Sequence, residues 1–160
     1  MPLRAPSAMA AAATLLLAAL GSMPARAQDL RTYAKAAAFD DVKFELNNAI
    51  IAKGLVIEAT GAIGAMLERT GPDIGATTPI YRNAEYLTFC SAVLSRRMME
   101  ADPVNVGYCP YVVFIYERVD RPGETVVGYR RPPQGSSDAA RKAFADIDKL
   151  LDDIVREAVQ

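Results

Sequence analysis

The sequence predicts an α+β fold, a two-layer sheet with helices in the order β-α-β-(α)-β-α-β-β-α. Three observations carry this prediction. Residues 39–54 and 136–159 place apolar side chains at three- and four-residue steps, the spacing of a helix with one buried face. The run Tyr111–Tyr116 is rich in β-branched and aromatic residues, as strands are. Pro122-Gly123 then turns the chain into a second such run, and a hairpin beside helices is typical of α+β domains.

The mature chain is expected to begin with a strand over Leu30–Ala36 and a helix over residues 39–54. Asp40 and Asp41 suit the positive N-terminal end of this helix, and Gly54 suits its end. The side chains that the helix is expected to bury are Phe39, Val42, Leu46, Ala49 and Ile50.

Two short elements and an irregular segment follow. The β-branched run Leu55–Thr60 predicts a second strand, and residues 63–71 predict a short helix ended by Gly71. Residues 71–85 have no usable period and contain two prolines and two glycines. Such segments often border a site, although a plain surface loop is the simpler interpretation.

A strand, a helix and a second strand are expected around the two cysteines. The strand Tyr86–Phe89 leads into Cys90, and Ser91 can cap a helix over Ala92–Ala101. The strand over Tyr108–Glu117 contains Cys109.

The end of the chain is expected to be a returning strand, a linker and a long helix. The strand covers Thr125–Arg130, and the linker covers residues 130–135. Ser136 or Ser137 opens the helix, which runs to about Val159. Its expected buried side chains are Phe144, Ile147, Leu151, Ile154 and Ala158.

Both faces of the strongest strand are apolar. Val113 and Ile115 face one way, whereas Val112, Phe114 and Tyr116 face the other. An apolar face needs a cover, and we expect a chain of this length to supply helices for one face only. We therefore expect a homodimer with two-fold symmetry.

The N-terminus is typical of a cleaved secretory signal. A basic start at Arg4 precedes a short apolar run, Ala8–Leu20, and the small residues of Ala25-Arg26-Ala27 suit a signal peptidase. The run is too short to span a bilayer. Residues 1–27 are therefore expected to be a signal peptide, and residues 28–160 a single α+β domain in the periplasm of a bacterium.

Composition excludes several classes of function. Cleavage removes Arg4 and Arg26, so 16 of the 18 basic residues remain against 19 acidic ones, and the net charge is −3. Neither this charge nor export favours nucleic-acid binding. The chain has no histidine, which excludes Ser-His-Asp and Cys-His catalysis and histidine-bound metals. No catalytic residue, metal site or cofactor is assigned, and whether the chain is an enzyme stays open.

The segments "FDDVKFELNNAIIAKGLVI", "YLTFCSAVLSRRMMEADPVNVGYCPYVVFIYE" and "ETVVGYRRP" resemble the domain of unknown function 302 family. The resemblance covers most of the mature chain. It implies a small α+β domain, often dimeric, with no assigned reaction. Exported members occur near sulfur-oxidation genes, which implies a link to periplasmic sulfur compounds.

Cys90 and Cys109 allow three interpretations. An even cysteine count in an oxidising compartment favours a disulfide, worth about 3 kcal/mol for a loop of about twenty residues. Alternatively, Cys90 precedes a helix N-terminus, where a lowered pKa would make the thiol reactive. A third interpretation makes the cysteines soft ligands for Cu(I), together with Met98 and Met99. If their strands pair antiparallel, both cysteines lie at one end of the sheet, and we expect them to be bridged there.

Two arginine pairs are candidate anion-binding residues, although such pairs are more often plain surface. They are Arg96 and Arg97, and Arg130 and Arg131. Guanidinium groups bind oxyanions such as thiosulfate or a sulfonate. The sequence thus favours a periplasmic binding or accessory domain for a small anionic or sulfur-containing ligand. The alternative is a thiol-based redox or sulfur-carrier protein that uses Cys90 and Cys109.

Overall fold

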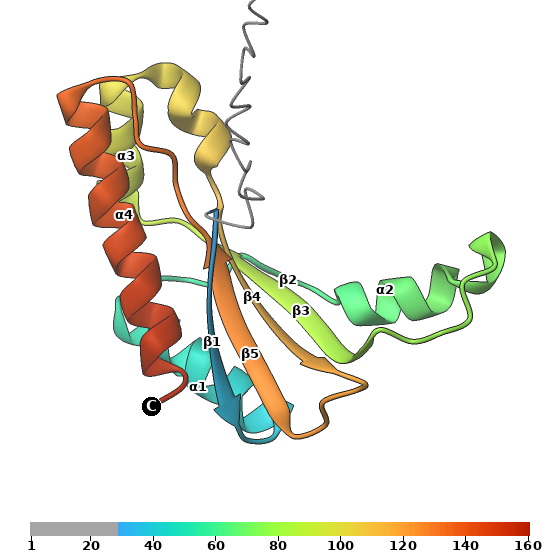
Figure 1. Cartoon of the computed structure of the whole chain (residues 1–160). Helices are drawn as coiled ribbons and strands as arrows, with labels where there is room; N and C mark the ends of the chain where they lie inside the picture. Colours follow the sequence, from blue (N-terminus) through green and yellow to red (C-terminus); the bar gives the residue numbers. More distant parts are fainter. Residues whose placement is uncertain (1–28) are drawn as a thin grey trace, which may run out of the picture.

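The computed structural model describes residues 29–160, and the predicted signal peptide of residues 1–27 lies outside them. In the described part, one five-stranded sheet has the order β1-β5-β4-β3-β2, and every neighbouring pair of strands is antiparallel. Figure 1 shows α1, α3 and α4 on one side of the sheet, while α2 projects away beyond β2 and β3. The predicted α+β class and element order are confirmed.

The elements follow the predicted sequence, with two short 3-10 helices added. The strands are β1 (Leu30–Ala36), β2 (Ala59–Gly61), β3 (Tyr81–Phe89), β4 (Tyr111–Arg118) and β5 (Glu124–Arg130). The α-helices are α1 (Phe39–Ala52), α2 (Ile63–Thr70), α3 (Ala92–Ala101) and α4 (Asp138–Glu157). The 3-10 helices are Pro72–Ile74 and Pro103–Tyr108.

Serine side chains set the start of two helices. The Ser91 hydroxyl accepts a hydrogen bond from the Leu94 amide at 3.3 Å and so caps α3 as predicted. The Ser137 hydroxyl accepts one from the Ala140 amide at 3.2 Å and caps α4. Within residues 29–160, no helix combines the length and apolar content needed to cross a bilayer.

The core lies between the sheet and the helices α1, α3 and α4. Both predicted helix stripes are buried in it, including Leu46 of α1 and Ile147 of α4. From the sheet, Val113, Ile115 and Val127 are fully buried against them. We call this side of the sheet the helix-covered face.

A carboxylate on α4 ties this helix to β1. Asp152 accepts hydrogen bonds from the Tyr33 hydroxyl at 2.6 Å, from Arg156 at 2.7 Å and from Arg31 at 3.3 Å. Burial is the largest single influence and opposes the charged form. The three hydrogen bonds and the positive charge of Arg156 together outweigh burial and lower the pKa of Asp152.

We call the other side of the sheet, which α1, α3 and α4 leave uncovered, the open face. Aromatic rings lie on this face. Phe114 stacks on Tyr116 at 6.3 Å between ring centroids, and Tyr81 contacts Tyr116 edge-on at 5.6 Å. A Cβ atom added at Gly128 would lie 2.6 Å from the Phe114 ring, so glycine lets this ring lie against β5. Val112 on the same face remains 38% exposed.

Helix α2 buries none of its residues. Ile63, Met66 and Leu67 are each 37% exposed, and α2 contacts the sheet at β3, where Gly64 approaches the Ala84 backbone. Apolar side chains that stay exposed on a projecting helix are a candidate contact for another molecule.

Three predicted boundaries are wrong. Most of the predicted strand Leu55–Thr60 is irregular, and β2 begins only at Ala59. Strand β3 begins at Tyr81 rather than Tyr86. The prediction missed its first residues because their polar side chains hide the alternating pattern of a strand. Tyr108 belongs to a 3-10 helix, and β4 begins at Tyr111.

Candidate functional site

The two cysteines lie at the same end of the sheet. Strands β3 and β4 are antiparallel with Phe89 opposite Tyr111, so the end of β3 adjoins the start of β4. Cys90 directly follows β3, and Cys109 precedes β4 by two positions. The predicted antiparallel pairing is therefore confirmed, and the two thiols are neighbours.

The predicted resting disulfide is wrong. Cys90 and Cys109 are both free and half-buried. Cys90 follows the end of β3, and Cys109 precedes the start of β4. The pairing of β3 with β4 makes the two cysteines neighbours but does not bring their sulfurs to bonding distance.

A short chain of hydroxyls extends from Cys109. Its thiol donates to the Ser95 hydroxyl oxygen at 3.1 Å, and that oxygen lies 2.9 Å from the Tyr111 hydroxyl. Ser95 comes from α3, so the helix, the sheet and the segment before β4 meet at this point. We call Cys90, Cys109, Ser95 and Tyr111 the thiol cluster.

The thiol cluster favours neutral side chains. Burial first, and the neighbouring Cys109 thiol second, raise the pKa of Cys90 to about 11. Burial also raises the pKa of Tyr111 to about 12. The helix N-terminus at Ser91 therefore does not produce the low pKa expected for a reactive Cys90 thiol.

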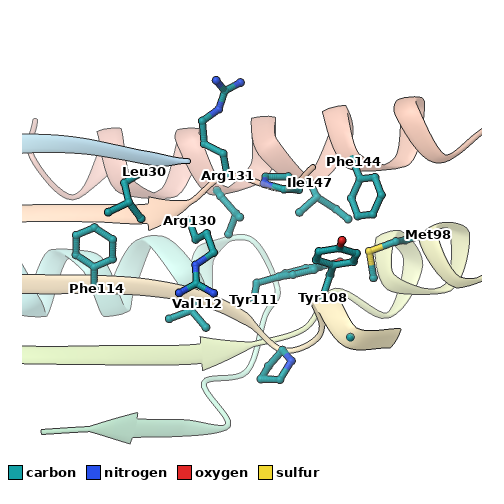
Figure 2. A pocket seen from close by; sticks show the side chains of 14 residues that line it. Leu30, Met98, Tyr108, Tyr111, Val112, Phe114, Arg130, Arg131, Phe144 and Ile147 are labelled. Atoms are coloured by element: carbon teal, nitrogen blue, oxygen red, sulfur yellow. The ribbon is translucent and has the colours of Figure 1, made fainter. Parts of the chain in front are cut away.

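A cavity of about 300 Å³ lies beside the thiol cluster, at the end of the sheet. Figure 2 shows its walls, which are mostly apolar and aromatic and come from the strand ends, α4 and the 3-10 helix before β4. The ring of Tyr111 belongs to both the cavity wall and the thiol cluster, whereas neither cysteine lines the cavity. Its principal apolar lining residues are Leu30, Val112, Phe114, Phe144, Ile147 and Leu151.

The arginines of the cavity differ in their partners. Arg131 donates two hydrogen bonds to Asp148, at 3.1 and 3.0 Å, and Asp148 also accepts one from the Tyr129 hydroxyl at 3.1 Å. Arg130 is exposed, and no side chain among residues 29–160 forms an ion pair with it. Figure 2 shows Arg130 directed towards Val112 and Arg131 directed to the opposite side.

The other arginine pair lies elsewhere, on α3. Arg96 pairs with Glu100 at 2.7 Å on the exposed surface. Arg97 lines a shallow groove between α3 and α4, together with Lys142 and Asp146. The structure thus brings Arg130 and Arg131 to one cavity and leaves Arg96 and Arg97 outside it.

Sequence reasoning missed the residues that connect the two parts of the site. Ser95 reads as an ordinary polar position within α3, and Tyr108 was assigned to a strand. In the structure Tyr108 contacts Phe144 edge-on at 5.1 Å and lines the cavity. The dipeptide Asp102-Pro103 was the available signal, because proline after a helix end marks a turn that can reposition the chain.

The comparisons with known proteins identify the family. The model of the domain of unknown function DUF302 matches residues 31–158, so the chain belongs to the DUF302 family. No curated protein matches it. The crystal structure of an uncharacterised conserved DUF302 protein from Bacillus stearothermophilus is similar, with a TM-score of 0.68 and 15% sequence identity. The similarity covers 82% of this chain and 99% of that chain, and at this identity it concerns the fold alone.

Proposed function

We propose that this chain is a periplasmic binding or accessory domain for small organic anions, with the cavity at Arg130 as its binding site. The observation that carries the proposal is a largely apolar cavity of about 300 Å³ with an arginine that has no partner among the described side chains. Apolar walls with few polar groups are typical of small-molecule sites.

The chemistry of the cavity favours one class of ligand. A guanidinium binds a carboxylate or sulfonate through two parallel hydrogen bonds, so Arg130 would hold the anionic group. Phe114 and Val112 beside it would contact an apolar body. The volume, at the small end of known ligand sites, favours a compact acid. A sulfonate would also agree with the proposed link to sulfur compounds.

Calorimetric titration of the purified protein with benzoate, benzenesulfonate, toluene and thiosulfate tests the site. The two aromatic anions are expected to bind more tightly than toluene, which lacks the charge, and than thiosulfate, which lacks the apolar body. Arg130→Gln should weaken their binding by about 10-fold or more, since a charge-assisted hydrogen bond contributes about 1.5–3 kcal/mol.

Arg121→Gln is the matched control, because Arg121 lies in the exposed turn between β4 and β5 and pairs with Glu124. It should leave binding unchanged. Equal binding by Arg130→Gln and the unaltered protein, or no binding of either anion, would rule out the proposed site.

The location proposed for this domain is the periplasm. Support comes from the basic start, the short apolar run and Ala25-Arg26-Ala27 in the sequence. N-terminal sequencing of the protein from a periplasmic extract should begin at Gln28. A product that retains Leu15–Leu20 would contradict the proposal.

The proposed partner is a second copy of the chain, bound through α2 and the aromatic part of the open face. The exposed apolar side chains of α2 and the half-buried ring of Tyr116, which faces away from α1, α3 and α4, support this contact. Light scattering should give the mass of two chains, and Tyr116→Lys should give one. Val119→Lys, at an exposed apolar residue outside β4, is the control. A single-chain mass for the unaltered protein would exclude the dimer.

A second candidate function is thiol-based redox or sulfur-carrier activity, favoured by the side-by-side thiols of Cys90 and Cys109. In the carrier reaction, a thiolate takes a sulfane sulfur from an organic trisulfide, which leaves as a disulfide. Intact mass after incubation with such a donor should increase by one sulfur atom. No increase, or the same increase in Cys90→Ser/Cys109→Ser, would remove this candidate.

A further inference from the structure

We propose that Cys90 and Cys109 form a two-coordinate site for a soft monovalent metal ion, Cu(I) or Ag(I). The site is distinct from the anion cavity, whose lining includes neither cysteine. It rests on three features of the thiol cluster: the adjacent placement of its two cysteines, the absence of a larger group of histidine, cysteine, aspartate and glutamate ligands among residues 29–160, and its hydroxyl chain.

The two sulfurs are placed for a shared ligand rather than for a bond with each other. They come from the adjoining ends of β3 and β4, where the strand register places the two cysteines beside each other, and both are free. A disulfide requires the sulfurs to approach to about 2.05 Å. Each sulfur–metal bond is longer than this, so two thiolates with one ion between them keep their sulfurs further apart.

The donor set selects the class of metal. Among residues 29–160, no group of three or more histidine, cysteine, aspartate or glutamate side chains is placed to hold a metal ion. A structural zinc site needs four ligands and is therefore not supplied here. Cu(I) and Ag(I) accept two thiolates in a near-linear arrangement, and thiolates are the soft ligands that select such ions.

The proton balance of binding is simple. Two thiols and one monovalent ion give a bis-thiolate complex of charge −1 and two released protons, and no atom is oxidised or reduced. Both cysteines are half-buried, so solvent can deliver the ion and remove the protons.

The hydroxyl chain can stabilise the charge that binding leaves behind. In the metal-free state the Cys109 thiol donates to Ser95. Once Cys109 has lost its proton, the Ser95 hydroxyl can reverse and donate to the sulfur, because the Tyr111 hydroxyl can donate to Ser95 in turn. Ser95 and Tyr111 are thus positioned to orient and stabilise a thiolate ligand, as outer-shell groups do at metal sites.

Anaerobic competition with the Cu(I) chelator bathocuproine disulfonate tests the proposal on the reduced protein. One Cu(I) per chain should be withdrawn from the chelator. Cys90→Ser and Cys109→Ser should each weaken binding by at least 100-fold, and Ser95→Ala should weaken it by about 10-fold, the lower end of outer-shell effects. Met66→Leu removes an exposed sulfur on α2 and is the matched control, with no expected change.

A measurement on the unaltered protein avoids dependence on the folding of the cysteine variants. One equivalent of Ag(I) should protect both thiols from iodoacetamide, and X-ray absorption of the Cu(I) form should give two sulfur neighbours. Failure of the protein to compete with the chelator overturns the site. So does a single-cysteine variant that binds as tightly as the unaltered protein.

Discussion

The two faces of the sheet are built from similar residues but have different surroundings. On β4, Val113 and Ile115 are fully buried in the core on the helix-covered face, whereas Val112 on the open face is 38% exposed. On the open face, Phe114 and Tyr116 cover one another and the adjacent backbone instead of being covered by a helix. Burial on the first face comes from long helices, and partial burial on the second comes from aromatic rings that lie against the strands.

An apolar strand face therefore does not by itself determine whether a helix covers it. The helix-covered face needs close packing to hold the domain together, and loss of volume there leaves a cavity. The open face can lose side-chain volume at lower cost, because solvent or a partner can fill the space.

The largest effect is expected from a matched pair of valines. Val113→Ala should lower the free energy of unfolding by about 2–3 kcal/mol, since two buried methyl groups are lost and a cavity remains. Val112→Ala, one residue away on the open face, should lower it by about 0.5 kcal/mol or less. Urea denaturation measures both. Equal losses would show that the open face is covered in solution, as a dimer through that region would require.

A glycine substitution tests how the aromatic rings cover the open face. Gly128→Ala places a Cβ atom 2.6 Å from the Phe114 ring and 2.5 Å from the Arg31 carbonyl oxygen, so backbone or ring must move. We expect a loss of about 2 kcal/mol, typical of overpacking.

Gly107→Ala is the control for this substitution, because its Cβ atom would meet no atom within 4 Å. Thermal unfolding should give a similar midpoint for Gly107→Ala and the unaltered protein, and a lower one for Gly128→Ala. A Gly128→Ala protein as stable as the control would contradict the close contact of Phe114 with β5.

A smaller effect is expected where α4 meets the end of β5. Asp148→Asn removes the charge that pairs with Arg131 and weakens the acceptor of the buried Tyr129 hydroxyl. The Arg131 side chain is 36% exposed, so solvent screens part of this pair, and we expect a loss of about 1–2 kcal/mol in urea denaturation. Asp153→Asn is the control on the exposed side of α4, and a loss as large there would refute a specific role for Asp148.

The last effect is expected only at alkaline pH, from the titration of Cys90. Its pKa rises from the ordinary 9.0 to about 11 in the folded state, so the folded protein holds the proton more tightly than the unfolded chain. The stabilising contribution is present below pH 9 and is lost as the pH rises to about 11. Cys90→Ser should flatten this part of the stability profile. An unchanged alkaline profile would show that Cys90 is not desolvated.

Periodic burial made most of the fold predictable from the sequence. The helix stripes at Leu46 and Ile147 repeat at the helical period, and the turn at Pro122-Gly123 fixes the hairpin. The start of β3 was missed because its polar residues have partners on other elements. Glu85, for example, pairs with Lys43 of α1 at 2.8 Å, a contact that sequence spacing does not reveal.

The candidate site was predictable only in part, because it forms where distant segments meet. The adjacency of Cys90 and Cys109 follows from antiparallel pairing, and the sequence supported that expectation. The expected bridge failed because strand pairing fixes backbone positions and not the distance between two sulfurs. Arg130 and Arg131 differ in their partners because successive side chains point to opposite sides of an extended chain. Only Arg131 is directed towards Asp148.

The register of the sheet also determines the order in which the protein can assemble during synthesis. Leu30 at the start of β1 pairs with Arg130 at the end of β5, and α4 closes the core only after that. A chain that emerges from the ribosome N-terminus first therefore cannot complete its sheet until nearly all of it has been made, since these contacts are far apart in sequence. Strand β1 therefore stays without its partner until β5 has been synthesised. Such delayed closure keeps the nascent chain open, which is the condition that threading through a translocation channel requires and which suits the proposed export.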